Sequence, residues 1–87
     1  MNLFFTNEGW DDYLAWQTDR RMLRLIHKLI ADIQRNGNAG LGKPEQPLRG
    51  DLAGWWSRRI NDQHRLIYRV KDDVIEIAQC GGHYGDH

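Results

Sequence analysis

The chain of 87 residues is long enough for one domain and too short for two separate cores. Its single cysteine, Cys80, cannot form an internal disulfide, and no segment has the roughly 18–20 apolar residues that a membrane helix needs. The N-terminal segment lacks the basic start and the long apolar run of a signal peptide. We therefore expect one cytoplasmic domain spanning residues 1–87, with no membrane partner.

The first 19 residues predict a strand followed by a short helix. The apolar run at 2–5 is suited to a buried strand. Thr6 or Asn7 can cap a helix that begins near Glu8, because their side-chain oxygens accept hydrogen bonds from its first N–H groups. This segment carries four acidic residues and no basic one.

A second, longer helix is predicted from the Thr18-Asp19 cap to about Asn36, with Gly37 ending it. Its apolar residues recur at helical spacing: Met22, Leu25, Ile26, Leu29, Ile30 and Ile33. Its other face is basic, with Arg20, Arg21, Arg24, Lys28 and Arg35. That face is open to two interpretations, an ordinary solvated surface or a stripe that follows phosphates.

Residues 36–51 are rich in Gly and Pro and predict a long loop. Three strands are expected after it, at 55–60, 65–71 and 74–80, joined by short turns in an antiparallel meander. The order β-α-α-β-β-β predicts an α+β fold. Both helices should cover one face of a mostly antiparallel, twisted sheet and leave the other face open.

The charges suggest what the open face binds. Residues 20–69 contain eleven Lys or Arg against four Asp or Glu, a net charge of +7, between acidic segments. Such a basic centre indicates a nucleic-acid partner. Strand alternation directs Leu66, Tyr68 and Val70 to the helices and Arg65, Ile67 and Arg69 to the open face. The preceding strand interleaves aromatic and basic residues, an arrangement that suits RNA: Trp55, Trp56, Arg58 and Arg59. We also expect at least one of the two tryptophans to lie in the core.

Three residue types suit RNA cleavage without a metal. Glu45 could act as the base, Arg65 could stabilise the charged phosphorane, and His83 could protonate the leaving oxygen. A zinc site is the alternative for the tail, since Cys80, His83 and His87 have ligand spacing beside Asp86. A strand-borne cysteine is more often a buried core thiol, so we expect neither a metal nor another cofactor.

Several ordered motifs resemble the YoeB/Txe family of bacterial type II toxin–antitoxin toxins, within the RelE/ParE-like superfamily. They are WDDYLAWQ at 10–17, GKPE at 42–45, PLRGDL at 47–52, GWWSRRI at 54–60, HRLIYRV at 64–70 and HY at 83–84. The resemblance implies a RelE-like fold and an mRNA endonuclease that cuts codons in the ribosomal A site. It also implies an antitoxin similar to YefM; whether the chain forms a homodimer is left open.

The resemblance implies a role for individual residues as well. The catalytic set would be Glu45, Arg65, His83 and Tyr84. The basic positions that match RNA contacts are Lys43, Arg49, Arg58 and Arg59, to which the strand pattern adds Arg69.

The chain departs from the family pattern twice. KPEPL appears as KPEQPL, so the base position is Glu45 counted from Lys-Pro and Gln46 counted back from the strand. Gly81-Gly82 precedes His83 and predicts a loosely held tail. Two non-catalytic functions therefore stay as alternatives: an RNA- or ribosome-binding module that blocks translation by occupancy, and a co-repressor held by an antitoxin.

Overall fold

Both helices begin at the capping residues that the sequence predicts, and the second also ends at the predicted glycine. In the computed structural model, which describes residues 1–45 and 50–81, α1 (Asn7–Ala15) follows Thr6, whose side chain accepts a hydrogen bond from Gly9 N. The second helix, α2 (Arg20–Asn36), follows Asp19, whose carboxylate accepts from Met22 N at 3.0 Å. Gly37 ends α2 with a φ of 62°, in the left-handed region that favours glycine.

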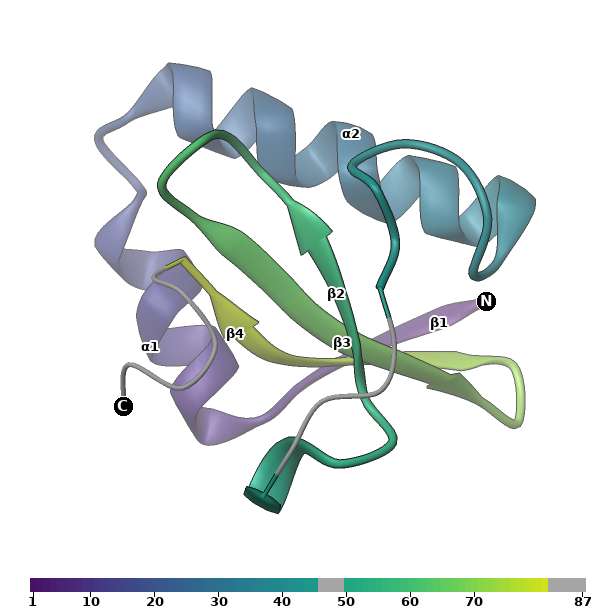
Figure 1. The fold of residues 1–87 in the computed structure, drawn as a ribbon. Helices are drawn as coiled ribbons and strands as arrows, with labels where there is room; N and C mark the ends of the chain where they lie inside the picture. Colours follow the sequence, from purple (N-terminus) through teal and green to yellow (C-terminus); the bar gives the residue numbers. More distant parts are fainter. Residues whose placement is uncertain (46–49, 82–87) are drawn as a thin grey trace.

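Four strands and one short 3-10 turn complete the described elements (Figure 1). They are β1 (Asn2–Phe5), the turn η1 (Gly50–Leu52), β2 (Trp56–Arg59), β3 (Arg65–Lys71) and β4 (Val74–Cys80). Their order in the sheet is β1-β4-β3-β2, with β1 parallel to β4 and the other pairs antiparallel. The α+β fold with a mostly antiparallel sheet is confirmed.

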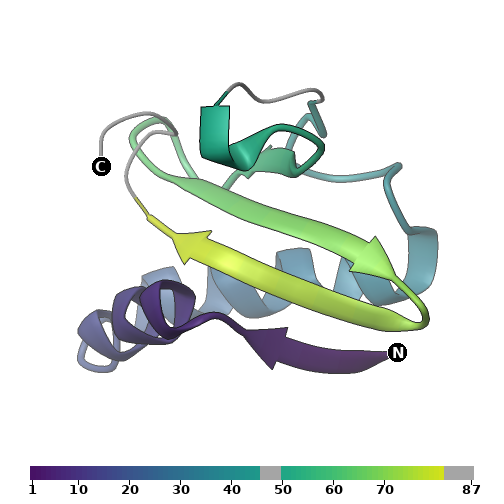
Figure 2. The same ribbon diagram turned by 90° about the horizontal axis from the view of Figure 1, so that it is seen from below.

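The two helices cover the same face of the sheet, and the segment around η1 lies on the opposite side (Figure 2). The core forms where the apolar face of α2 meets β3 and β4. It includes Met22, Ile26, Leu29, Ile33, Leu66, Tyr68, Ile75 and Ile77. Gly9 lets α1 approach β4 closely, because a Cβ there would overlap the carbonyl oxygen of Ile77.

The first strand is an edge strand, so the prediction of a buried strand at 2–5 is wrong. It pairs only with β4, and Leu3 and Phe4 are 38% and 54% exposed. The apolar run alone could not distinguish a central strand from an edge strand, because that depends on which strands flank it.

A bulge in β4 keeps both faces of the sheet in register. Ile67 pairs with Gln79 and Tyr68 pairs with Ile77, so Ala78 is the extra residue. Arg65, Ile67 and Arg69 therefore share the face opposite the helices, as strand alternation predicts. That face is only partly open, because Ser57, Ile67 and Gln79 at its centre are buried.

Within residues 1–45 and 50–81, neither helix combines the length and apolar character needed to cross a bilayer.

Candidate functional site

Glu45 is held at the edge of the sheet by a backbone bridge to β2. Its N–H donates to Ser57 O at 2.9 Å, and Ser57 N donates to Glu45 O at 3.0 Å. Residues paired in this way place their side chains on the same face. Ser57 pairs in turn with Ile67, which lies opposite the helices. The exposed Glu45 carboxylate thus belongs to the face that carries Arg65.

Arg59 and Arg65 form the next row on this face. They are direct partners in the β2–β3 ladder, two residues along each strand from the Ser57–Ile67 pair. This step corresponds to about 7 Å. Arg59 is exposed, and Arg65 is half-buried, with its Nη1 donating to Asn61 O at 3.4 Å. Two guanidinium groups and one carboxylate therefore occupy adjacent rows.

The end of β4 is fixed beside Arg65. Gly81 N donates to Arg65 O at 2.8 Å, and Gln79 Nε2 donates to Gly81 O at 2.8 Å. Gly81 has a φ of 129°, and a Cβ there would lie 3.1 Å from the Trp16 indole nitrogen. Glycine is thus favoured at position 81 by its backbone conformation and by the close approach of Trp16. The tail after it, which is expected to be loosely held, lies outside the described residues.

Side chains of α1 and of its C-cap residue hold the same strand end. The Trp16 indole N–H donates to Cys80 O at 2.7 Å, and Cys80 N donates to Asp12 Oδ2 at 3.0 Å. The Trp16 ring also meets His64 edge-on, at 4.9 Å between ring centroids. The sequence did not predict that Asp12 and Trp16 support this strand end, although both belong to the motif at 10–17 that resembles the family.

Four of the predicted site residues lie outside the described residues: Arg49, His83, Tyr84 and the alternative base Gln46. Lys43 is described and exposed, with a φ of 49°, two residues before Glu45. The described part of the site is thus Glu45, Arg59 and Arg65, with Lys43 near its edge.

Arg69 lies on the same face, where its guanidinium contacts two neighbouring side chains. Its Nη2 is 3.1 Å from Glu76 Oε2, and its guanidinium lies 4.4 Å from the centre of the Trp55 ring. Within the described residues, no hydrogen-bond acceptor meets its buried Nε. Trp55 is thus part of this face, while Trp56 packs against the core, as expected for one of the two.

Arg58 does not lie on this face, so its expected position is wrong. It pairs with Leu66 on the face that the helices cover, and it is 0% exposed. The motif places two arginines side by side, and strand alternation must direct them to opposite faces. Arg58 meets Asp32, the one acidic residue of α2, which the sequence reading did not single out.

Cys80 is a buried core thiol, as predicted. It is 0% exposed, and burial, with a smaller effect of Asp12, raises its pKa to about 12. Zinc binds the thiolate, which this environment disfavours. The described residues contain no cluster of His, Cys, Asp or Glu suited to a metal, and the two histidines of the zinc alternative lie outside them. His27, on α2, bonds Tyr13 Oη at 2.8 Å.

The YoeB-like toxin family of bacterial type II toxin–antitoxin systems matches this chain over residues 5–84. The chain belongs to this family. Toxin YoeB of Streptomyces coelicolor is 52% identical over 85 residues, which cover 97% of this chain and 100% of that protein. Toxin YoeB of Escherichia coli K12 has the same identity and coverage.

Solved structures of family members have the same fold. A YoeB/ParE toxin from Agrobacterium tumefaciens has a TM-score of 0.88 at 52% identity, over 97% of this chain and 100% of that one. The YoeB dimer from Staphylococcus aureus has a TM-score of 0.87 at 44% identity, over 97% and 98% of the chains. The H87Q mutant of YafQ from E. coli has a TM-score of 0.77 at 17% identity, over 93% of this chain and 91% of that one, and at this identity the likeness concerns the fold alone.

Proposed function

We propose that this protein is a ribosome-dependent mRNA endoribonuclease that acts in the cytoplasm, without a metal, as the toxin of a type II toxin–antitoxin pair. The observation that supports this best is the position of Glu45. Its bridge to Ser57 puts a carboxylate on the sheet face that carries Arg59 and Arg65. A base and cations on one face can supply two of the three roles in RNA cleavage by the 2′-hydroxyl, removal of its proton and stabilisation of the phosphorane.

The proposed reaction uses one residue for each step. Glu45 takes the proton of the 2′-hydroxyl, and the 2′-oxygen attacks the phosphorus. Arg65 and Arg59 stabilise the charge that develops on the phosphorane oxygens. The bond from phosphorus to the 5′-oxygen breaks, and His83 donates a proton to that oxygen, leaving a 2′,3′-cyclic phosphate and a 5′-hydroxyl. The family resemblance adds Tyr84, next to His83 in the chain, to the proposed catalytic set. Gly81, the last described residue before them, donates a backbone hydrogen bond to Arg65 O.

RNA would be held by the basic residues around this centre: Lys43, Arg49, Arg59 and Arg69. For Arg69 the ion pair with Glu76 reduces the charge available to a phosphate, while Trp55 offers a ring on which a base could stack. Arg58 is not part of this set, because its guanidinium is buried on the other side of the sheet.

The proposed protein partner is an antitoxin similar to YefM. The S. aureus relative, of 44% identity, is found in a heterotetrameric YoeB–YefM complex as well as in a dimer. An acidic segment that folds on this chain could cover the basic face and neutralise it. Because the S. aureus relative is found as a dimer, a homodimer of this chain is proposed as well.

Primer extension on translating ribosomes tests the cleavage. The purified chain should cut mRNA in the A site, and Glu45→Gln should slow cleavage by about 10²–10⁴-fold, the usual contribution of a general base. Glu8→Gln is the matched control, since it removes an exposed acid at the start of α1. No cleavage by the folded chain, where an active relative cuts, would reject the proposal.

Two further variants separate catalysis from occupancy. Arg65→Ala and His83→Ala should each slow cleavage by about 10²–10³-fold while the domain stays folded. A fully active His83→Ala variant would remove that residue from the site. Translation arrest with intact mRNA, unchanged by His83→Ala, would instead identify a module that blocks by occupancy. Absence of growth arrest when the chain is expressed alone would favour a co-repressor.

A further inference from the structure

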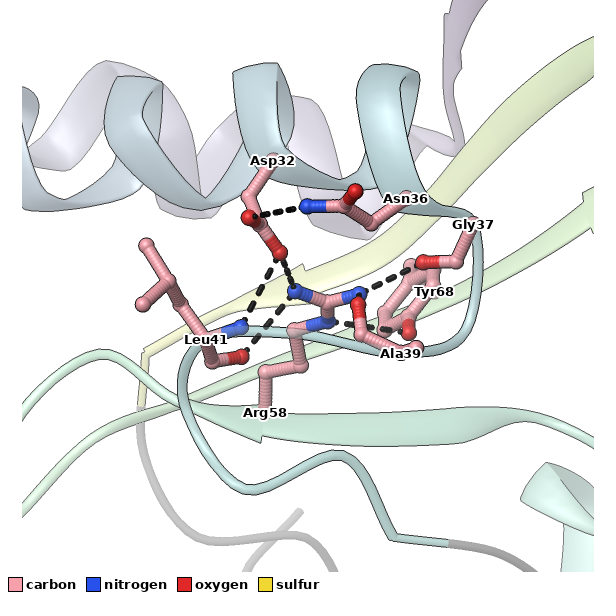
Figure 3. Close-up of polar contacts among 7 residues, drawn as sticks. All are labelled: Asp32, Asn36, Gly37, Ala39, Leu41, Arg58 and Tyr68. Carbon is pink, nitrogen blue, oxygen red and sulfur yellow. Dashed lines mark hydrogen bonds and ion pairs between the residues drawn. The ribbon is translucent and has the colours of Figure 1, made fainter.

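The guanidinium of Arg58 is buried between β2, the end of α2 and the loop that follows it (Figure 3). An arginine has five N–H donors, and each of them has an acceptor here. Nε donates to Tyr68 Oη at 3.0 Å. The other four go to Asp32 Oδ2 and to the carbonyl oxygens of Gly37, Ala39 and Leu41.

Three of these acceptors are backbone carbonyls of one loop, so Arg58 sets the path of that loop. Asp32 also fixes this loop directly, because its Oδ2 accepts a hydrogen bond from Leu41 N at 3.0 Å. Leu41 is thus held at its N–H by the carboxylate and at its carbonyl by the guanidinium. Gly40 has a φ of 108°, and a Cβ there would overlap the Asp32 carboxylate. The loop fits the ion pair so closely that only glycine is accommodated at this point.

The same loop leads directly to Glu45. Gly42 O accepts a hydrogen bond from Arg59 N at 2.7 Å, and Glu45 pairs with Ser57 three residues later. The backbone bonds to the loop come from the neighbours of Arg58 on each side along β2. The Arg58 side chain holds the loop from the helix face. The side-chain bonds of Arg58 thus hold the loop at residues 37–41, and the backbone bonds of β2 hold it at Gly42 and Glu45.

From this arrangement we infer that Arg58 is a positioning residue for the reaction: its buried guanidinium fixes the loop at 37–42 and so places the Glu45 carboxylate beside Arg59 and Arg65. The inference rests on the proposed function, in which Glu45 is the base. Arg58 itself touches neither RNA nor the reacting atoms. It acts from the opposite face of the sheet, through the backbone of residues 37–45.

The chemistry explains why an arginine is needed here. A lysine has three donors on one atom and cannot reach acceptors that surround a planar fork. The charge is balanced by Asp32, whose pKa the hydrogen bond from Arg58 holds below its ordinary value. Burial raises the pKa of Tyr68, which keeps its hydroxyl neutral as an acceptor for Nε. Only a guanidinium can therefore donate to all the acceptors that surround this position.

A double-mutant cycle between Arg58→Lys and Glu45→Gln tests the inference on the full chain with translating ribosomes. Alone, Arg58→Lys should lower single-turnover cleavage at saturating ribosomes by about 100-fold, the effect expected of a catalytic group displaced by about 1 Å. The ribosome concentration that gives half the maximal rate should change little, because the side chain does not contact RNA. In the Glu45→Gln background, Arg58→Lys should have almost no further effect, since both changes remove the same function.

Amide hydrogen exchange supplies a readout that does not depend on cleavage. The amides of Glu45 and Arg59 report the loop, because they donate to Ser57 O and Gly42 O. Thr6 N, which donates to Ile77 O at the other side of the sheet, serves as the reference. Arg58→Lys should speed exchange at the two loop amides relative to Thr6. Ile75→Ala, a core truncation on β4, is the control: it lowers stability without selective exchange at the loop.

The outcomes distinguish the inference from the proposed function. Equal effects of Arg58→Lys in both backgrounds, or loop amides no faster than Thr6, would overturn the role of Arg58. If the unaltered chain does not cleave mRNA, the proposed function fails, and the exchange experiment alone decides whether Arg58 holds the Glu45 loop. If Arg58→Lys does not fold, Asp32→Asn replaces it in both experiments, because that variant keeps the arginine and weakens its main partner.

Discussion

Arg58 and Arg59 are neighbours on β2, yet the pleat of the strand directs them to opposite faces of the sheet. Arg58 is 0% exposed and donates five hydrogen bonds under α2. Arg59 is exposed in the row that also carries Arg65, next to the row of Glu45. The same type of side chain therefore has a structural role on one face of the sheet and is available to a phosphate on the other.

The difference follows from the energetics of burying charge. A guanidinium removed from water is tolerated only when its donors are satisfied and its charge is paired, as Asp32 and three carbonyls achieve for Arg58. On the exposed face a cation keeps its hydration until a ligand replaces it. Five variants would break or sharpen this contrast.

Replacing each arginine of the pair by alanine should give opposite results. Arg58→Ala leaves Asp32 and three loop carbonyls without their partner, and we expect a loss of about 3–5 kcal/mol of unfolding free energy. Arg59→Ala should change that free energy by less than about 1 kcal/mol, while slowing cleavage by about 10²-fold. Urea unfolding and primer extension measure the two effects. Equal losses of stability would remove the distinction between the faces.

A core truncation under α2 should affect stability alone. Ile33 is 0% exposed in the core, so Ile33→Ala should cost about 2–5 kcal/mol of unfolding free energy. Cleavage per folded molecule should stay near that of the unaltered chain, because Ile33 does not contribute to the face of Glu45. A selective loss of cleavage at full folding would instead couple the core to the site.

Acidification should weaken the Asp32–Arg58 pair. The pKa of Asp32 is lowered in the folded chain, chiefly by the hydrogen bond from Arg58, so its contribution to stability is complete above the ordinary value of 3.8 and is lost as pH falls below it. Asp32→Asn should therefore be less stable than the unaltered chain at neutral pH. The difference should shrink as the solution is acidified through the lowered pKa, measured by urea unfolding at each pH.

The ion pair of Arg69 and Glu76 should matter least for folding. Both side chains are partly exposed, and Glu76→Gln should change stability by no more than about 1 kcal/mol. Removing the carboxylate should increase the affinity of the exposed face for single-stranded RNA, most clearly at low salt. Filter binding at two salt concentrations tests this, and unchanged affinity would argue against an RNA contact by Arg69.

The helices and the meander could be predicted because their signals are local. Thr6, Asp19 and Gly37 bound the helices through capping and backbone conformation, and strand alternation assigned Arg65, Ile67 and Arg69 to one face. The exposure of β1 could not be predicted, because an edge strand is defined by what lies beside it. Glu45 and Arg65 were predicted from their chemistry and from motif resemblance, and the structure brings them to one face of the sheet. Their catalytic roles stay predictions, as do those of His83 and Tyr84 and the RNA contact of Arg49, three residues that lie outside the described part of the chain.

The sequence by itself determined the order of the elements, the family motifs and the candidate catalytic residues, since these depend on neighbours along the chain. Only the tertiary structure decided between the two arginines of β2 and brought Asp32, distant along the chain, to one of them. It also placed Glu45 in the register of the sheet, through its bridge to Ser57. The physical reason is that both outcomes depend on contacts of β2 with α2 and with the loop after it, and these contacts join residues that are distant along the chain.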